Sequence, residues 1–264
     1  MPDDAVHLDL DGGVATVTLD HPDVRNALTQ EVALGVADAF DDIATSDARC
    51  VVLEATGNAF CAGGDITAML ERFSSDVPQT DVVDRIVTET AGAIRAVRTC
   101  DLPTVAKIDG SAFGAGAGLA IACDILLASE DAKISFGFRQ VGLAVDSGVS
   151  YLLPRLVGEN VAKELVYTGD LVDAERAAEL GLFNHVYPSE TFEEQASELI
   201  DRIASGPTAA LSTSKRLLQQ SQDSSLETAI RNEAAAQATL LESEDHREGA
   251  TAFLEGRDPE FEGA

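Results

Sequence analysis

The sequence predicts an α/β fold, with a layered core of strands and helices followed by a helical region. In the first half of the chain, apolar strand-like runs alternate with segments of helical periodicity, a pattern typical of stacked α/β cores. From Pro188 onward helical periodicity dominates to the end. With 264 residues, 45% of them hydrophobic, the chain can bury one large core. We therefore expect a core at residues 1–195 and a C-terminal helical region at residues 196–264.

The expected elements follow one another in a simple order. Two strands at 6–10 and 14–19 flank Gly12-Gly13 as a hairpin, and Thr29 can cap a helix that runs to about Ala44. The rest of the first half has strands at 50–55, 104–108 and 124–128 and helices at 66–73, 81–98 and 115–122. The second half has helices at 147–157, 159–167 and 173–180 and a short strand at 183–186.

Two glycine-rich turns, at residues 60–65 and 109–118, are the most informative features of the chain. Each follows a strand-like run and precedes a helix-like one, so each can leave backbone N–H groups without a partner. Two such donors that converge on one point would stabilise a carbonyl oxygen that becomes negative during a reaction. Tight strand-to-helix packing would explain either turn alone, but the pair favours acyl-group chemistry.

With these flanks the sequence resembles the crotonase superfamily, the enoyl-CoA hydratases and isomerases that act on acyl-CoA thioesters. The resemblance runs nearly end to end, through both turns and through Asp20-His21-Pro22, Arg25-Asn26-Ala27-Leu28, Arg247-Glu248-Gly249 and Ala252-Phe253-Leu254-Glu255. It implies a crotonase-like spiral of ββα units with a C-terminal helical trimerisation region, in a homotrimer or a dimer of trimers. It also implies an acyl-CoA substrate and no separate cofactor, since coenzyme A is part of that substrate.

The resemblance assigns site residues by position. The first carbonyl-binding N–H falls on Gly64, and the second aligns with Ala115, where it would open a helix whose dipole adds to the hydrogen bond. Asp65 is expected to cap the following helix rather than to react. The remaining expected substrate contacts are Arg25, Ala27 and Leu28 beside the CoA moiety, Ala62, Gly63, Asp65 and Ile66 beside the thioester and adenine, and Phe113 and Phe138 in the acyl pocket. Isolated aromatic residues such as these two are more often core than pocket.

Two glutamates that flank the water-addition site of typical hydratases align here with Gly118 and Phe138. Neither residue can move a proton, so the two-carboxylate hydration mechanism lacks both of its usual groups. We therefore favour double-bond isomerisation. Two alternatives stay open: enoyl-CoA hydration by another base or by a water that Asp146 holds, and a catalytically idle subunit that binds CoA esters.

Asp146 is the carboxylate that remains. Residues 142–148 resemble a segment of crotonase-type isomerases, including the ring-1,2-epoxyphenylacetyl-CoA and dienoyl-CoA isomerases, in which an Asp faces the acyl chain. Asp146 would take a proton from one carbon and return it to another, and apolar neighbours such as Leu143 and Val145 would raise its pKa toward a useful range. The alternative is that Asp146 is the N-cap of the helix expected from Ser147.

The chain is strongly acidic. Its 46 Asp and Glu against 18 Lys and Arg give a net charge of -28. Such a surface repels itself in dilute buffer, whereas salt at about 1 M shortens the screening length to roughly 3 Å. We interpret the chain as a salt-adapted (halophilic) protein, the alternative being an ordinary acidic enzyme. No cluster of Lys and Arg stands out, so neither nucleic acid nor a membrane is an expected partner.

Neither a targeting segment nor a metal site is expected. The N-terminal residues are acidic and no apolar stretch reaches about 18 residues, so we expect a cytoplasmic protein. The four cysteines lack close-pair metal spacing and are interpreted as buried thiols, and the four histidines are scattered. Cys61 lies in the first turn, where packing is favoured over nucleophilic chemistry.

Overall fold

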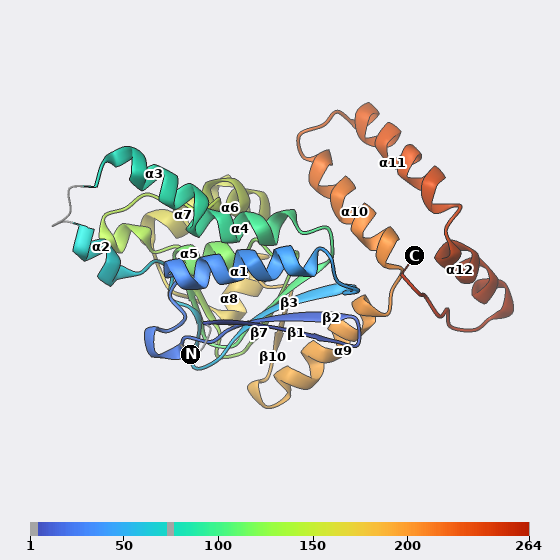
Figure 1. Ribbon diagram of the computed structural model, residues 1–264, viewed down its shortest axis with the longest axis horizontal. Helices are drawn as coiled ribbons and strands as arrows, with labels where there is room; N and C mark the ends of the chain where they lie inside the picture. Colours follow the sequence, from blue (N-terminus) through green and yellow to red (C-terminus); the bar gives the residue numbers. More distant parts are fainter. Residues whose placement is uncertain (1–4, 73–76, 264) are drawn as a thin grey trace.

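The computed structural model describes residues 5–72 and 77–263. It shows a layered α/β core and a helical arm that leaves it at one end (Figure 1). The larger sheet has the strand order β1-β2-β3-β5-β7-β10, in which only β1 and β2 pair antiparallel. Its strands are β1 Val6–Asp11, β2 Val14–Leu19, β3 Cys50–Ala55, β5 Thr104–Ile108, β7 Ile125–Ser129 and β10 His185–Tyr187.

A second sheet of very short strands, absent from the sequence prediction, has the order β4-β6-β8-β9. Its strands are β4 Ala59–Cys61, β6 Ser111–Phe113, β8 Lys133–Ser135 and β9 Val172–Asp173. Strands β4, β6 and β8 each follow a long strand of the first sheet and pair parallel with one another. The chain thus repeats a long strand, a short strand and a helical segment, which confirms the expected spiral of ββα units.

The helices lie around these sheets and in the arm. Those of the first half are α1 Gln30–Ile43, α2 Ile66–Arg72, α3 Gln79–Thr88, α4 Thr90–Thr99 and α5 Ala115–Ala120. Those of the second half are α6 Val149–Val157, α7 Glu159–Thr168, α8 Ala174–Glu179, α9 Phe192–Ala204, α10 Thr208–Ser221, α11 Leu226–Leu240 and α12 Glu244–Glu255. Three short 3-10 segments, η1 Pro22–Val24, η2 Phe138–Val141 and η3 Ser189–Thr191, complete the list.

Most predicted elements are confirmed to within one or two residues, and the hydroxyl of Thr29 caps α1 by accepting from the N–H of Val32. The single helix predicted at 81–98 is wrong, because the chain breaks at Glu89, where φ is -93° and ψ is -88°. The break lets α4 bury one face in the core while α3 buries none of its residues. Phe73, the expected end of α2, lies outside the described residues.

The predicted domain boundary at 195/196 falls inside α9, which belongs to the core. One face of α9 packs against the larger sheet in a cluster of eight buried residues: Cys50, Val52, Val105, Leu127, Phe192, Ala196, Ile200 and Ala204. The main cluster lies on the opposite side of the sheet, under α1, α4, α5 and α6. The helices that leave the core therefore begin after Gly206, with α10.

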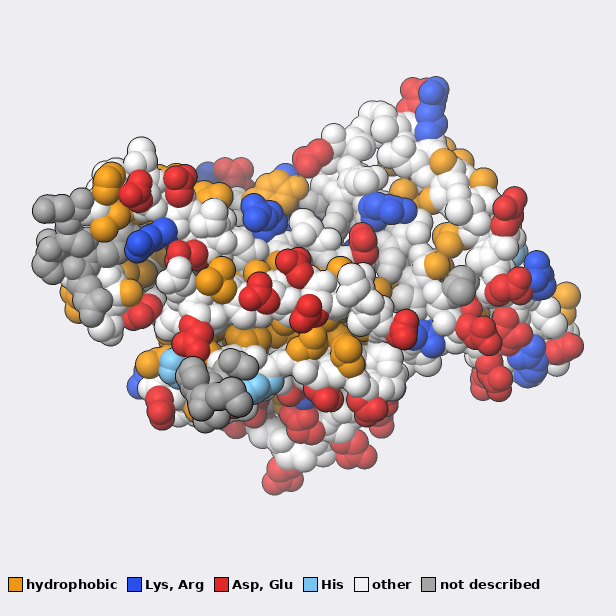
Figure 2. All heavy atoms as spheres, in the orientation of Figure 1, with side chains coloured by type: hydrophobic (Ala, Val, Ile, Leu, Met, Phe, Trp, Pro, Cys, Tyr) orange, Lys and Arg blue, Asp and Glu red, His pale blue; other side chains and the backbone are white. Residues whose placement is uncertain are grey.

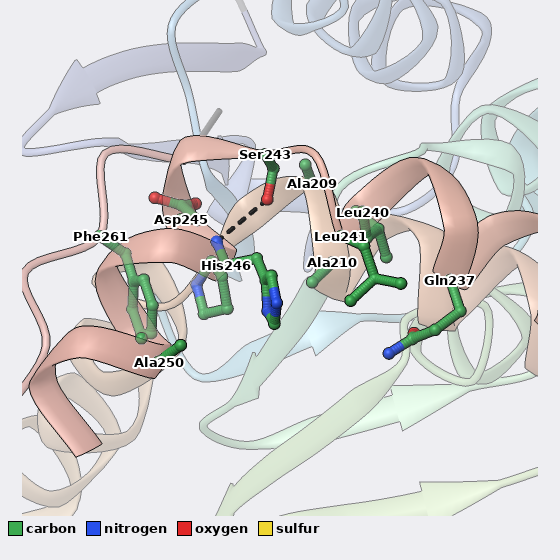
Figure 3. Close-up of a pocket in the computed structure, with 12 residues that line it drawn as sticks. Ala209, Ala210, Gln237, Leu240, Leu241, Ser243, Asp245, His246, Ala250 and Phe261 are labelled. Carbon is green, nitrogen blue, oxygen red and sulfur yellow. Dashed lines mark hydrogen bonds between the residues drawn. The ribbon is translucent and has the colours of Figure 1, made fainter. Parts of the chain in front are cut away.

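The arm formed by α10, α11 and α12 is joined to the core by polar contacts. Lys215 of α10 forms a largely buried ion pair with Asp124 at 2.7 Å, and Arg49 donates to the carbonyl of Gly206 at 2.7 Å. The three helices enclose an open, largely apolar cavity of about 270 Å³ (Figure 3). Its labelled lining residues include Ala210, Leu240, Leu241, Ala250 and Phe261.

Candidate active site

Pairing of β4 with β6 brings the two glycine-rich turns together. The strands run parallel, with Ala59 opposite Ser111 and Cys61 opposite Ala112, so the turns that follow them meet at the same end. A Cβ at Gly63, whose φ is +87°, would lie 2.5 Å from the carbonyl oxygen of Phe113. Only glycine fits there, because any side chain would push the turns apart.

The expected carbonyl-binding donors lie on these touching turns. The same Cβ position on Gly63 is 3.3 Å from the nitrogen of Ala115, so the segment that carries Gly64 lies against the start of α5. Ala115 is the first residue of α5, and Gly114 before it donates to the carbonyl of Ser135 at 2.8 Å. Within the described turns and caps, neither Gly64 nor Ala115 donates a backbone hydrogen bond. Because α5 has six residues, the N–H groups rather than a long helix dipole supply the positive potential.

Residues 25–28 are bonded directly to the first turn. The N–H of Leu28 donates to the carbonyl of Gly63 at 2.7 Å, and the N–H of Ala62 donates to the carbonyl of Arg25 at 3.0 Å. Ala27 and Leu28 are buried, whereas Arg25 is exposed. The structure therefore brings these predicted binding residues to the edge of the candidate site.

Asn26, which the sequence analysis did not select, holds this segment in place. It is fully buried, with φ of +53°, and its side-chain amide donates to the carbonyls of Thr56 and Ala59 at 2.9 and 2.8 Å. Its side-chain oxygen accepts from the N–H of His21 at 2.7 Å. The signal was its residue type, because Asn tolerates the left-handed conformation better than most residues.

Asp65 caps α2, as predicted. Its carboxylate accepts from the N–H groups of Thr67 at 2.8 Å and Ala68 at 3.2 Å. One turn further, Met69 is a second residue that the sequence analysis did not select. A Cβ at Gly64 would lie 2.5 Å from the terminal methyl of Met69, so this flexible side chain covers Gly64 in the structure.

Asp146 does not cap α6, so the capping alternative is wrong. The N-cap of α6 is Gly148, so no side chain caps this helix. Ser147 and Gly148 both adopt the left-handed conformation, with φ of +53° and +77°. The predicted helix start at Ser147 therefore moves to Val149. One oxygen of the Asp146 carboxylate is buried and, within the described chain, has no hydrogen-bond partner.

Burial raises the pKa of the Asp146 carboxyl above its ordinary value, because an ionised group loses solvation there. The neighbouring Ser147 hydroxyl opposes part of this rise in pKa, although it does not reach hydrogen-bond geometry with the carboxylate. The site thus contains a half-buried carboxylate with no ion-pair partner among the described residues. A carboxylate in this state can act as a base near neutral pH.

The loop that carries Asp146 packs against α5, close to Ala115. A Cβ at Gly118 would lie 3.1 Å from a methyl of Val149 and 3.5 Å from the carbonyl oxygen of Ser147. Gly118 is three residues after Ala115, roughly 4.5 Å along the helix axis. Space beside Gly118, which the resemblance aligns with a hydratase glutamate, is therefore occupied here by Ser147 and Val149 of the segment that follows Asp146.

The aromatic residues expected in the acyl pocket contribute less than predicted. Phe138 is 7% exposed and belongs to the main core cluster, which supports the packing alternative. Phe113 is half-buried, and its ring packs against Gly137, leaving no room there for a Cβ. The thiol of Cys61 is fully buried, which raises its pKa to about 12 and leaves it a packing role.

Comparisons with known proteins identify the family of the chain. The family model described as enoyl-CoA hydratase/isomerase matches residues 9–264. The 1,2-epoxyphenylacetyl-CoA isomerase of Escherichia coli is 32% identical over 253 residues, which cover 95% of this chain and 95% of that protein. The 2,3-dehydroadipyl-CoA hydratase of the same organism has the same identity over 253 residues and covers both chains to the same extent.

Among solved structures, an enoyl-CoA hydratase from Mycobacterium smegmatis matches with a TM-score of 0.90 and 30% sequence identity. The match covers 98% of this chain and 99% of that chain. These likenesses establish the crotonase fold, including the C-terminal helical region, and an acyl-CoA enzyme. The chain belongs to the enoyl-CoA hydratase/isomerase family.

Proposed function

We propose that this protein is an enoyl-CoA isomerase, which moves a carbon–carbon double bond within an acyl-CoA thioester through an enolate. The observation that carries the proposal is the Asp146 carboxylate, which neither caps a helix nor pairs with a described cation. A half-buried carboxylate without a pairing partner lowers the stability of the folded state. Such a cost is typical of residues that take up and release a proton during catalysis.

In the proposed reaction, the thioester oxygen accepts hydrogen bonds from the N–H groups of Gly64 and Ala115. Asp146 removes a proton from C2 of a 3-enoyl-CoA, the electron pair passes into the thioester, and the negative charge develops on that oxygen. Protonated Asp146 then returns the proton to C4, and the double bond lies between C2 and C3. No water is consumed, so the hydratase glutamates are not needed.

Substrate binding in this proposal depends on residues 25–28 and on the first turn. Their hydrogen bonds to each other place exposed Arg25 beside the turn that would hold the thioester. Met69 must move off Gly64 for the carbonyl to dock, which its flexible side chain allows at low cost. Coenzyme A enters as part of the substrate, and the mechanism requires no further cofactor.

The test is a paired assay with either a 3-enoyl-CoA or crotonyl-CoA, with products identified by mass and chromatography. We expect the conjugated 2-enoyl-CoA to form at unchanged mass. Formation of 3-hydroxybutyryl-CoA from crotonyl-CoA as the main activity would instead favour hydration. Thermal stabilisation by both esters with no turnover would identify an idle CoA-ester-binding subunit.

We propose that the enzyme is adapted to a salt-rich cytoplasm, so the same assay is run at low and high KCl. Acidic side chains spread over the visible face of the molecule and gather around α9 and α12 (Figure 2). At a net charge of -28 the folded state repels itself, and high salt screens that repulsion. We expect both the rate and the melting temperature to rise from about 0.1 M to about 2 M KCl, where the Debye length falls from about 10 Å to below 3 Å.

We propose that the arm formed by α10 to α12 assembles the protein into homotrimers or dimers of trimers. Large apolar side chains on it are exposed, including Leu226 at 77% and both Phe253 and Leu254 at 86%, and its cavity opens to the outside. Light scattering in 2 M KCl is expected to give a multiple of three protomers. The double variant Phe253→Ser/Leu254→Ser is expected to dissociate, whereas Leu10→Ser, at an exposed residue in β1, is the control.

A further inference from the structure

Ser147 adopts a backbone conformation that its residue type does not favour. It is one of three non-glycine residues with positive φ in the described chain, the others being Arg25 and Asn26. The hydrogen bonds of the Asn26 side chain account for that pair. Ser147, at φ +53°, has no such side-chain bond, and an observed outlier of this kind is grounds for a functional hypothesis.

The Ser147 hydroxyl is also buried without a partner. The residue is 5% exposed, and its side-chain oxygen forms no hydrogen bond within the described chain. The preceding residue, Asp146, has a buried carboxylate oxygen in the same condition. Glycine at position 147 would remove both the backbone strain and the unpaired hydroxyl, so folding alone gives no reason for serine.

Packing keeps this hydroxyl beside the carboxylate. The Ser147 carbonyl lies against Gly118 of α5, and Val149, which is fully buried, contacts the same glycine position. On the N-terminal side of Ser147, the carbonyl of Asp146 accepts a hydrogen bond from the N–H of Val149 at 3.0 Å. The backbone is therefore held on both sides of Ser147, and we infer that its side chain moves mainly by rotation about χ1. That single rotation directs the O–H either toward or away from the Asp146 carboxylate.

We propose that Ser147 is a positioning residue for the proposed base. When Asp146 is ionised, the Ser147 hydroxyl donates a hydrogen bond to its buried oxygen and directs the other oxygen toward the substrate carbon. When Asp146 is protonated, the hydroxyl is released from this hydrogen bond and is free to rotate. The proposal rests on Asp146 being the base of the proposed isomerase.

Two variants remove the hydroxyl with opposite effects on the backbone. Ser147→Ala keeps the left-handed strain, whereas Ser147→Gly relieves it and is expected to melt at the same or a higher temperature. Because one hydrogen bond to a charged group is lost in both, we expect both to lower kcat roughly tenfold and to leave KM within about twofold. Ser147→Cys, which retains a weaker donor, is expected to fall between wild type and Ser147→Ala.

The pH profile separates positioning from packing. A hydroxyl that donates to the ionised carboxylate lowers its pKa, so its removal raises that pKa. The acidic limb of the pH profile of kcat is therefore expected to move to higher pH, by roughly half to one pH unit, in both variants. Equal kcat and an unmoved limb in both variants, with Asp146→Asn inactive, would overturn the inference and leave the isomerase proposal standing. An active Asp146→Asn would overturn both proposals.

A titration without turnover gives a second readout. With [4-13C]aspartate in the protein, the Asp146 carboxyl signal is assigned by its absence in Asp146→Asn and followed with pH. We expect its midpoint to be higher in both Ser147→Ala and Ser147→Gly than in wild type. A midpoint that is identical in all three proteins would refute the role of the hydroxyl, whatever substrate the enzyme uses.

Discussion

The two glycine-rich turns and the Asp146 loop, which together form the proposed active site, are built and held in opposite ways. The turns contribute backbone N–H groups and are held by strand pairing and by close contacts that exclude a Cβ, as at Gly63. The Asp146 loop would contribute one side chain, and it is held by left-handed Ser147 and by Val149, which both pack against Gly118. The first turn is tied to residues 25–28 by two backbone hydrogen bonds, whereas the loop holds a buried carboxylate oxygen and a buried hydroxyl that have no partner within the described chain.

This difference indicates which parts of the site change reaction type. Backbone donors stabilise any thioester enolate, so the turns suit every reaction of the family. The side chain that moves the proton decides between isomerisation and hydration, and it can come from α5 or from the loop. In the proposed site, the loop packs against Gly118, which the family resemblance aligns with a glutamate of typical hydratases.

The largest expected effect is that of Asp146→Asn. Loss of a general base typically lowers the rate roughly 10²- to 10⁴-fold. We therefore expect kcat of the variant to fall by about this factor, while its affinity for acyl-CoA stays unchanged. The same variant should raise the stability of the fold while it lowers activity. Since burial raises the pKa of Asp146 in the folded state, ionisation disfavours folding, and this penalty grows as pH rises through the folded pKa.

Asp146→Asn is therefore expected to melt at a higher temperature than wild type at pH 8, with the difference disappearing below pH 4. The measurement is calorimetry across pH beside steady-state kinetics. Asp170→Asn, at an exposed acidic residue on another loop, is the control for the loss of one surface charge. Unchanged kcat in Asp146→Asn would show that the loop does not supply the base.

The next largest effect is expected from Ala115→Pro, which deletes one backbone donor of the turns. Proline is tolerated at the first position of a helix, and Gly114 before it has no Cβ to meet the ring. Removal of one oxyanion donor costs roughly 10²- to 10³-fold in kcat. Ala174→Pro is the matched control, because Ala174 is the buried first residue of α8, which also has six residues. A similar loss of activity in both variants would mean that proline damages the fold and not the donor.

The sequence was most informative about the turns and the long elements. Alternating apolar runs and capping residues such as Thr29 are local signals, and most of the long strands and helices were predicted from them. The strands β4, β6, β8 and β9 were missed because two or three residues are too few to show a period of two. Yet the pairing of β4 with β6 is what joins the turns, so their contact could be expected only from the family resemblance.

The Asp146 loop could be read only in part. The sequence points to Asp146 itself, but the conformation of its loop depends on a packing contact with Gly118 that no local pattern reveals. An Asp before a helix is usually a cap, and left-handed Ser147 overrides that tendency. Met69 and Ser147 were missed for the same reason, because their roles arise from tertiary neighbours and not from their spacing.

The smallest effect is expected where the two regions touch, at Gly118. A Cβ there would lie 3.1 Å from a methyl of Val149, a contact that a shift of a few tenths of an ångström relieves. Gly118→Ala is therefore expected to lower kcat only a few-fold, by moving the loop and its carboxylate slightly.

Val149→Ala removes that methyl and should lower stability by about 1 to 2 kcal/mol through the cavity it leaves. In the double variant the added methyl occupies the vacated space, so kcat should recover beyond the product of the two single effects. Strict additivity would show that the loop and α5 act independently, and that glycine at 118 is not what admits Asp146 to the site.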